Sequence, residues 1–212
     1  MTQARDLSAI AARLFDTVAA MGPDTAGVSR PAFSPVETQV LEYLRAEAEQ
    51  AGLVTRYDHG QNLIMSLPED AAADRYVLIG SHVDSVPMGG NFDGLAGVVA
   101  GMLCLLRARQ EGRGFARPVK VIAMRGEESA WFGPCYIASK CLMGTLTPAE
   151  LEARHKGDGR TLRAPLVVAG NQYAYASEPL LLAAWGQRWR QHGATADEVK
   201  AKLGKILQGA DP

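Results

Sequence analysis

The chain has 212 residues, of which 47% are hydrophobic, and its 22 lysine and arginine residues nearly balance 23 aspartate and glutamate residues. The apolar share is ample for a packed core. The formal net charge of -1 gives no reason to expect a nucleic acid or an anionic membrane as partner, so we expect a small molecule.

The sequence also indicates a cellular location. It has no apolar run that approaches the length of a membrane span and no signal-peptide pattern, so we expect a cytoplasmic protein. Cys104, Cys135 and Cys141 lack C-x-x-C spacing, which is typical of reduced thiols in a reducing compartment.

Two helices are predicted in the first fifty residues. Apolar residues recur at spacings of three and four over residues 5–20, the pattern of an amphipathic helix. Ser34 to Glu37 has the capping-box pattern with proline at the first helical position, and the apolar stripe after it continues to a stop at Gly52.

The middle of the chain predicts strands around one buried helix. Residues 53–57, 63–67 and 76–80 are short apolar segments, and the last is a near-continuous run of the kind buried on both faces of a sheet. Residues 94–107 predict a largely buried helix and residues 118–124 another buried strand, which completes a βαβ unit. We therefore expect an α/β fold with a mixed sheet flanked by helices.

The last third of the chain reads as helical. A second capping box at Thr147 starts a short helix. Two longer helical patterns follow, and Trp185 and Trp189 share a face of the first. We interpret residues 1–163 as one unit and residues 164–212 as an unassigned, helical tail packed on it.

A histidine and an aspartate follow directly on the third predicted strand. In an α/β sheet, ligands bind beyond the carboxyl ends of the strands, which is where His82 and Asp84 emerge. Alternation along an extended segment puts both side chains on one side, so that Asp84 can accept the spare imidazole proton and orient His82 toward a metal. A purely structural hydrogen bond between the two is the alternative.

Three carboxylates are predicted at the same edge of the sheet. Asp93 lies in a glycine-rich turn before the buried helix, where it is either a site carboxylate or the N-cap. Glu127 and Glu128 follow the next strand, although adjacent acids are commonly solvated. Buried charge of one sign is costly unless a cation neutralises it, so the convergence of these residues with His82 favours a metal.

The motifs around these residues carry a family resemblance. G-S-H-x-D over residues 80–84, G-G-x-F-D-G over residues 89–94 and G-E-E-S-x-x-F-G over residues 126–133 resemble M20-type metallohydrolases. Within that clan they most resemble N-carbamoyl-L-amino-acid hydrolases, beta-ureidopropionase and allantoate amidohydrolase. The resemblance runs from about Leu7 to about Leu162, and it implies a truncated zinc-dependent exopeptidase-type catalytic domain.

The resemblance implies a role for each matched residue. His82 would bind one metal ion, Asp93 would bridge two, and Glu128 would bind the second. Asp84 would orient His82, and Glu127 would be the general base in hydrolysis of a linear C–N amide bond of a carbamoyl or ureido compound. Zn²⁺ suits these ligands, as do Mn²⁺, Co²⁺ and Ni²⁺. The family binds up to two ions, and we expect one or none in this chain.

The family pattern is incomplete in this sequence. Two further histidine ligands and the family's lid, with its grip on the substrate carboxylate, have no counterpart, so we expect any oligomer to form without that lid. His155 and His192 follow Glu128 but do not match the family contexts, and we expect surface or capping roles for them and for His59. Arg125 either perturbs the site or pairs with a carboxylate.

Three functions stay open at this point. The first is an M20-like amidohydrolase whose site is completed by other residues or by another chain. The second is a non-catalytic, degenerate metallohydrolase fragment that acts as a binding or interaction protein. The third is a di-metal aminopeptidase, which would release free amino acids from peptides. Metal content together with an N-carbamoyl-amino-acid hydrolysis assay distinguishes them.

Overall fold

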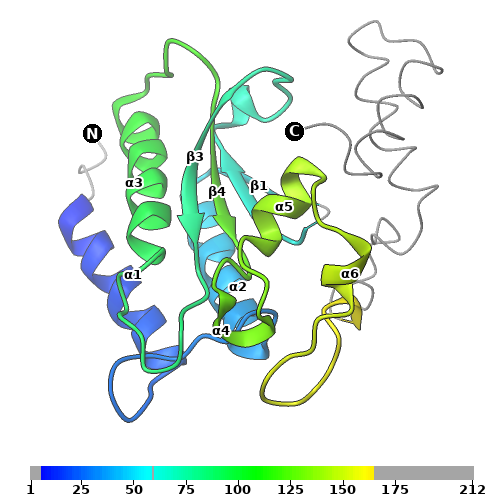
Figure 1. Ribbon diagram of the computed structural model, residues 1–212. Coiled ribbons are helices and arrows are strands. Elements are labelled where there is room, and N and C mark those ends of the chain that lie inside the picture. The colour runs from blue at the N-terminus through cyan, green and yellow to red at the C-terminus, as the bar shows by residue number, and fades with distance from the viewer. Residues whose placement is uncertain (1–5, 59, 165–212) are drawn as a thin grey trace, which may run out of the picture.

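The computed structural model of the protein describes residues 6–58 and 60–164 (Figure 1). The predicted helical tail, with Trp185, Trp189 and His192, lies outside the described residues, and so does His59. Among the helices that are described, none combines the length and the apolar character that crossing a bilayer requires.

Four strands form a mixed sheet in the described part of the chain, in the order β1-β2-β4-β3. They are β1 (Val54–Tyr57), β2 (Leu63–Ser66), β3 (Val77–His82) and β4 (Val119–Met124). β2 is antiparallel to both neighbours, whereas β3 and β4 are parallel, with His82 opposite Met124. The predicted mixed α/β sheet is confirmed.

Three long helices share one hydrophobic core with the sheet. They are α1 (Leu7–Met21), α2 (Pro35–Gln50) and α3 (Leu95–Glu111), and α3 connects β3 to β4 as the predicted βαβ unit requires. Alternate residues of the two middle strands join this core, because side chains of a strand point to opposite faces. These strand residues are Leu63, Met65, Val121 and Ala123.

Short helices follow the last strand and enclose a second, smaller core. They are α4 (Ser129–Phe132), α5 (Ile137–Met143) and α6 (Pro148–Leu151), in addition to the 3-10 turn η1 (Pro68–Asp70) earlier in the chain. The capping box predicted at Thr147 is present and starts α6. α4 and α5 were not predicted, because helices this short carry too few turns to show an apolar period.

The prediction that β3 is buried on both faces is wrong for the described residues. β3 is an edge strand among them, and Val77 at its start is 45% exposed. α3 packs against β3, but no described strand pairs with its outer edge. The run that is covered on both sides is β4, which pairs with β2 and β3 and has four buried residues in succession.

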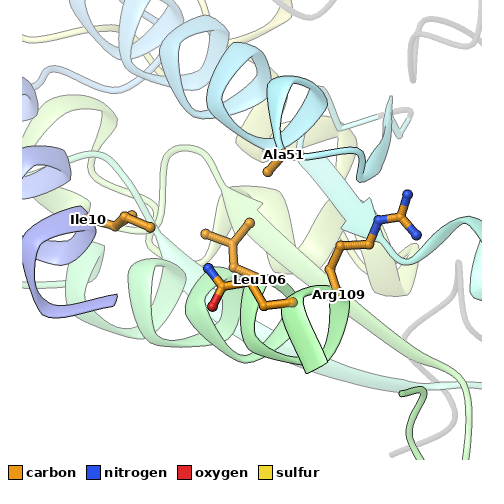
Figure 2. A pocket seen from close by; sticks show the side chains of 5 residues that line it. Ile10, Ala51, Leu106 and Arg109 are labelled. Atoms are coloured by element: carbon orange, nitrogen blue, oxygen red, sulfur yellow. The ribbon is translucent and has the colours of Figure 1, made fainter. Parts of the chain in front are cut away.

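A small pocket of about 140 Å³ opens between the three long helices (Figure 2). It is lined by Ile10 of α1, Ala51 at the end of α2, and Leu106, Arg109 and Gln110 of α3. These residues of α3 belong to its C-terminal half, roughly 20 Å along the helix from its start. The pocket is therefore separate from the carboxyl ends of β3 and β4.

Candidate metal centre

The parallel pairing of β3 and β4 brings the predicted site residues together. Both strands end at the same edge of the sheet, beside α4 (Figure 1). His82 is the last residue of β3, and Glu127 and Glu128 follow within four residues of the end of β4. Asp93 comes two residues before α3, which begins at this edge.

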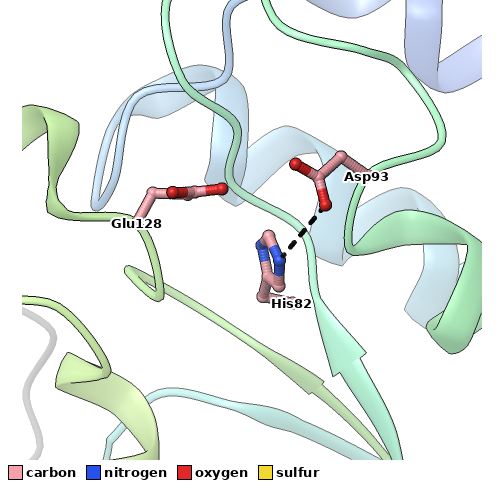
Figure 3. Close-up of side chains that lie close together, drawn as sticks. All are labelled: His82, Asp93 and Glu128. Carbon is pink, nitrogen blue, oxygen red and sulfur yellow. Dashed lines mark ion pairs between the residues drawn. The ribbon is translucent and has the colours of Figure 1, made fainter.

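His82, Asp93 and Glu128 form a group whose potential ligand atoms all lie within 4.8 Å of one another (Figure 3). Nε2 of His82 lies 4.0 Å from Oδ1 of Asp93 and 3.8 Å from Oε2 of Glu127. The imidazole is buried, whereas the Asp93 carboxylate is 61% exposed. The four residues that the sequence predicts at one edge therefore lie close together in the structure.

Asp84 joins His82 to both glutamates. Nδ1 of His82 lies 3.0 Å from the backbone oxygen of Asp84 and 3.3 Å from its Oδ1. An N–H at Nδ1 that points to these oxygens leaves the lone pair of Nε2 for a ligand. The fully buried carboxylate of Asp84 also accepts the backbone N–H groups of Glu127 and Glu128, each at 3.0 Å. This second function of Asp84 was not predicted.

Electrostatics at the site indicate a surplus of negative charge. Burial lowers the pKa of His82, but the hydrogen bond and charge of Asp84 and the charge of Glu127 outweigh it and raise the pKa above its usual value. Burial and the neighbouring charge of Glu127 raise the pKa of the Glu128 carboxyl. Both raised pKa values mean that the site favours bound positive charge, either as protons or as a cation.

Asp93 precedes α3 and does not cap it, so the N-cap alternative is wrong. The N-cap is Gly94, with φ +67° and no side-chain cap. The Asp93 carboxylate lies beside the His82 ring (Figure 3). A Cβ on Gly94 would lie 2.5 Å from that ring, so only glycine allows this approach of the turn to His82.

Arg125 pairs with a carboxylate that is not one of the potential metal ligands. Its Nε donates to Oε2 of Glu37 at 2.6 Å, and both side chains are buried. Its two other guanidinium nitrogens donate to Gln61 and Thr38. Of the two predicted outcomes for Arg125, pairing with a carboxylate is confirmed.

Glu37 has a different role from the capping role that its pattern predicted. The hydroxyl of Ser34 accepts the N–H of Glu37, as expected of an N-cap. The N–H of Ser34, however, donates to Pro31, and the Glu37 carboxylate accepts the N–H groups of Phe33 and Gly126. The capping box is thus half formed, and its acidic residue is directed to the loop that carries the glutamates.

Arg30 is a further contributor to the site that no sequence pattern indicated. It is fully buried, its Nε donates to the backbone oxygen of Val83 at 2.6 Å, and one of its terminal nitrogens donates to Oδ1 of Asn91 at 3.0 Å. It therefore ties the segment after His82 to the turn that presents Asp93.

His155 is buried, so the surface role, one of its two predicted roles, is wrong, whereas its Nδ1 accepts the N–H groups of Gly157 and Asp158 in the turn that follows it. Its ring stacks on Trp131 at 5.7 Å between centroids and meets the edge of Phe132 at 5.1 Å. The charged neighbours Arg154 and Lys156 suggested solvent exposure, but aromatic contact with α4 offsets the cost of burying the imidazole. His155 is not a member of the group of potential ligands.

Comparison with known families supports the predicted branch. The model of peptidase family M28 matches residues 62–156, which contain all the predicted site residues, although the motifs suggested M20. The N-carbamoyl-L-amino acid amidohydrolase of Geobacillus stearothermophilus is 35% identical over 144 residues, covering 68% of this chain and 35% of the relative. The allantoate amidohydrolase of Escherichia coli (strain K12) is 31% identical over 135 residues, covering 63% and 33%. The chain spans about a third of the length of these relatives.

Solved structures show the same fold. A hydantoinase/carbamoylase family amidase from Burkholderia ambifaria matches with a TM-score of 0.69 and 30% identity, over 79% of this chain and 41% of that one. The complex of AtUAH with (S)-hydroxyglycine matches with a TM-score of 0.66 at 20% identity, which concerns the fold alone. The described chain thus has the α/β fold of a part of a hydantoinase/carbamoylase family amidase.

Proposed function

We propose that this chain holds a divalent metal ion for the hydrolysis of a linear C–N amide bond in a carbamoyl or ureido compound. The observation that carries the proposal is the group of His82, Asp93 and Glu128, whose potential ligand atoms lie within 4.8 Å of one another with Glu127 beside them. The similarity to N-carbamoyl-L-amino acid and allantoate amidohydrolases supports the class of substrate.

The residues present fit such an ion. Imidazole nitrogen and carboxylate oxygen are both ligand types that zinc accepts, and a catalytic zinc site has three protein ligands and keeps one position open. Mn²⁺, Co²⁺ and Ni²⁺ accept the same donors. Three donors suffice for one ion, so we assign one ion to the described residues.

The chemistry divides between the ion and the side chains. A bound divalent ion would polarise the scissile carbonyl and lower the pKa of a water molecule. The partly exposed carboxylate of Glu127 takes a proton from the attacking water and passes it to the leaving nitrogen. Asp84 fixes the imidazole of His82 and, through two N–H groups, the backbone of both glutamates.

The test combines metal loading with an N-carbamoyl-amino-acid hydrolysis assay on the full chain. We expect one ion per chain, weaker binding in Glu128→Gln, and retained binding with at least about a hundredfold lower turnover in Glu127→Gln. Glu152→Gln is the matched control, because this exposed acid pairs with Arg163 instead of approaching the site. Failure to bind a metal, or turnover that Glu127→Gln leaves unchanged, would contradict the proposal.

The match to peptidase family M28 is the observation that favours a second candidate, a metal-dependent aminopeptidase. The same preparations distinguish it, because an aminopeptidase releases free amino acids from peptides and leaves N-carbamoyl amino acids intact. Metal binding without turnover of either substrate would identify a binding protein.

A further inference from the structure

Four consecutive backbone N–H groups, from Arg125 to Glu128, all donate to buried side chains. Arg125 N–H donates to Oδ1 of Asn62 at 3.1 Å and Gly126 N–H to Oε1 of Glu37 at 3.0 Å. The next two donate to the carboxylate of Asp84. The loop that presents the glutamates is thus fixed residue by residue by side chains from elsewhere in the chain.

The Glu37 carboxylate accepts more hydrogen bonds than helix capping requires. Oε2 accepts Nε–H of Arg125 at 2.6 Å and the N–H of Phe33 at 2.7 Å, while Oε1 accepts Gly126. In the complete capping box of α6, Glu150 performs the capping role while it keeps 21% of its side chain exposed. The Glu37 side chain is fully buried, so capping alone does not explain its position.

Burial of this carboxylate has an energetic cost. Taking an ion from water into a protein costs several kcal/mol, even after relaxation. Burial raises the pKa of the Glu37 carboxyl, while the Arg125 guanidinium and the N–H of Gly126 oppose this change. The ionised form therefore depends on its donors, two of which belong to the loop before Glu127.

The two backbone N–H groups that donate to Glu37 belong to residues whose backbone φ lies in the left-handed region. Phe33 has φ 55° and Gly126 has φ 57°, and a Cβ on Gly126 would lie 2.6 Å from the Phe33 ring. The guanidinium of Arg125 lies over the same ring, 5.1 Å from its centroid. One carboxylate thus holds two unusual turns against each other, directly before the glutamates.

We propose that Glu37 is a positioning residue of the candidate metal centre: its buried carboxylate, through Arg125 and Gly126, fixes the loop that places Glu127 and Glu128. The inference rests on the proposed metal-dependent function, because it names a group that sets the geometry of that site. Sites of this kind tolerate displacements of only about 0.5 Å before their chemistry suffers.

The first test is Glu37→Gln in the full chain, titrated with Co²⁺ and followed by the visible absorption of the bound ion. The amide keeps the size of the side chain but loses its charge and one acceptor. We expect at least about tenfold weaker Co²⁺ binding and a changed spectrum, as is found when residues that orient metal ligands are replaced. The matched control is Glu47→Gln, on the same helix, which loses an ion pair with Arg13 near the surface. It should bind Co²⁺ as the unmodified chain does.

The second variant separates positioning from stability. Glu37→Met combined with Arg125→Met removes both buried charges, which is often neutral or favourable for stability. Because neither buried charge is left, we expect the thermal stability to recover at least in part. The Co²⁺ affinity should not recover, because the N–H of Gly126 still lacks its acceptor. Unchanged Co²⁺ affinity and spectrum in Glu37→Gln, whatever its melting temperature, would overturn the inference.

Amide hydrogen exchange tests the inference independently of metal. The Gly126 amide should exchange at least about tenfold faster in metal-free Glu37→Gln, whereas Glu47→Gln should match the unmodified chain. If the unmodified chain binds no Co²⁺, the proposed function fails, and exchange still decides whether Glu37 fixes the loop. Unchanged exchange at Gly126 in Glu37→Gln overturns the inference.

Discussion

Asp84 accepts the backbone N–H of Glu128 at 3.0 Å, across 44 positions of sequence. Its other carboxylate oxygen accepts the N–H of Glu127 and lies 3.3 Å from Nδ1 of His82. One buried side chain therefore couples the imidazole at the end of β3 to the glutamates after β4. A substitution of Asp84 should therefore affect both His82 and the two glutamates.

Asp84→Asn should impair both stability and metal binding. Hydrogen bonds to a charged group contribute about 1.5–3 kcal/mol each, and the amide cannot accept with both ends. We expect a loss of about 2–3 kcal/mol in the free energy of unfolding and at least about tenfold weaker Co²⁺ binding. Chemical denaturation and metal titration measure the two effects.

The matched control for this change is Asp70→Asn. Asp70 is also buried, and its carboxylate accepts the N–H of Val119 at 3.0 Å, at the opposite end of β4. This variant should lose stability and retain its affinity for Co²⁺. Equal loss of affinity in both variants would show that the effect of Asp84 is one of general stability.

Gly94→Ala should push the His82 ring away from Asp93. The added Cβ would lie 2.5 Å from ring atoms of His82. Gly112→Ala is the control, because Gly112 has a similar φ of +64° but open space around its Cβ position. Both variants should lose about 1–2 kcal/mol of stability from the left-handed backbone, and only Gly94→Ala should weaken Co²⁺ binding, by about tenfold or more. Equal affinities would argue against the clash.

Zinc should stabilise the folded chain. A ligand at about a hundred times its dissociation constant adds about 2.7 kcal/mol to the free energy of unfolding, provided that it binds only the folded state. For a chain of this size that corresponds to a rise of roughly 5–10 °C in melting temperature. Differential scanning calorimetry with Zn²⁺, and with EDTA to reverse the effect, measures it. Asp93→Ala should reduce the rise, whereas Asp16→Ala, on the exposed face of α1, should not.

The contribution of Glu150 should depend on pH. Partial burial raises its pKa, but hydrogen bonds from Lys140 and Thr147 outweigh this and hold the pKa below the usual 4.5. A carboxyl with a lowered folded-state pKa stabilises above its unfolded pKa, and the stabilisation is lost as the pH falls through the folded value. Glu150→Gln should therefore cost about 0.5–1 kcal/mol at pH 7.

The check is chemical denaturation of Glu150→Gln and the unmodified chain across pH 3–7. The difference in the free energy of unfolding should stay constant from pH 7 to about pH 5 and shrink below pH 4.5. A difference that is the same at pH 3 as at pH 7 would mean that the ionised carboxylate contributes nothing.

Local periodicity was sufficient to predict the long elements and the approach of the site residues. The stripes of α1, α2 and α3 and the apolar segments of the strands are within a few residues of their predicted bounds. Since parallel strands end at one edge of a sheet, a histidine at the end of β3 and two acids after β4 had to come near each other. The motifs added Asp93, which the structure places beside His82.

The contacts that fix the site could not be predicted, because they join segments far apart in the sequence. Glu37 fitted a local capping box, and nothing near it indicated a partner 88 positions later. His155 had charged neighbours that concealed its aromatic contacts with α4. The edge position of β3 among the described strands depends on which strands are its neighbours, and an apolar run carries no information about that.

Among the described residues, the candidate ligands lie on β3, before α3 and just after β4, between positions 82 and 128, whereas Arg30, Glu37 and Asn62 precede them in the chain. The donors thus lie close together along the chain, whereas the side chains that hold their loops come from the N-terminal third. If the proposed site binds a metal ion, its affinity would therefore report on tertiary assembly, in particular on whether α2 has packed against the sheet.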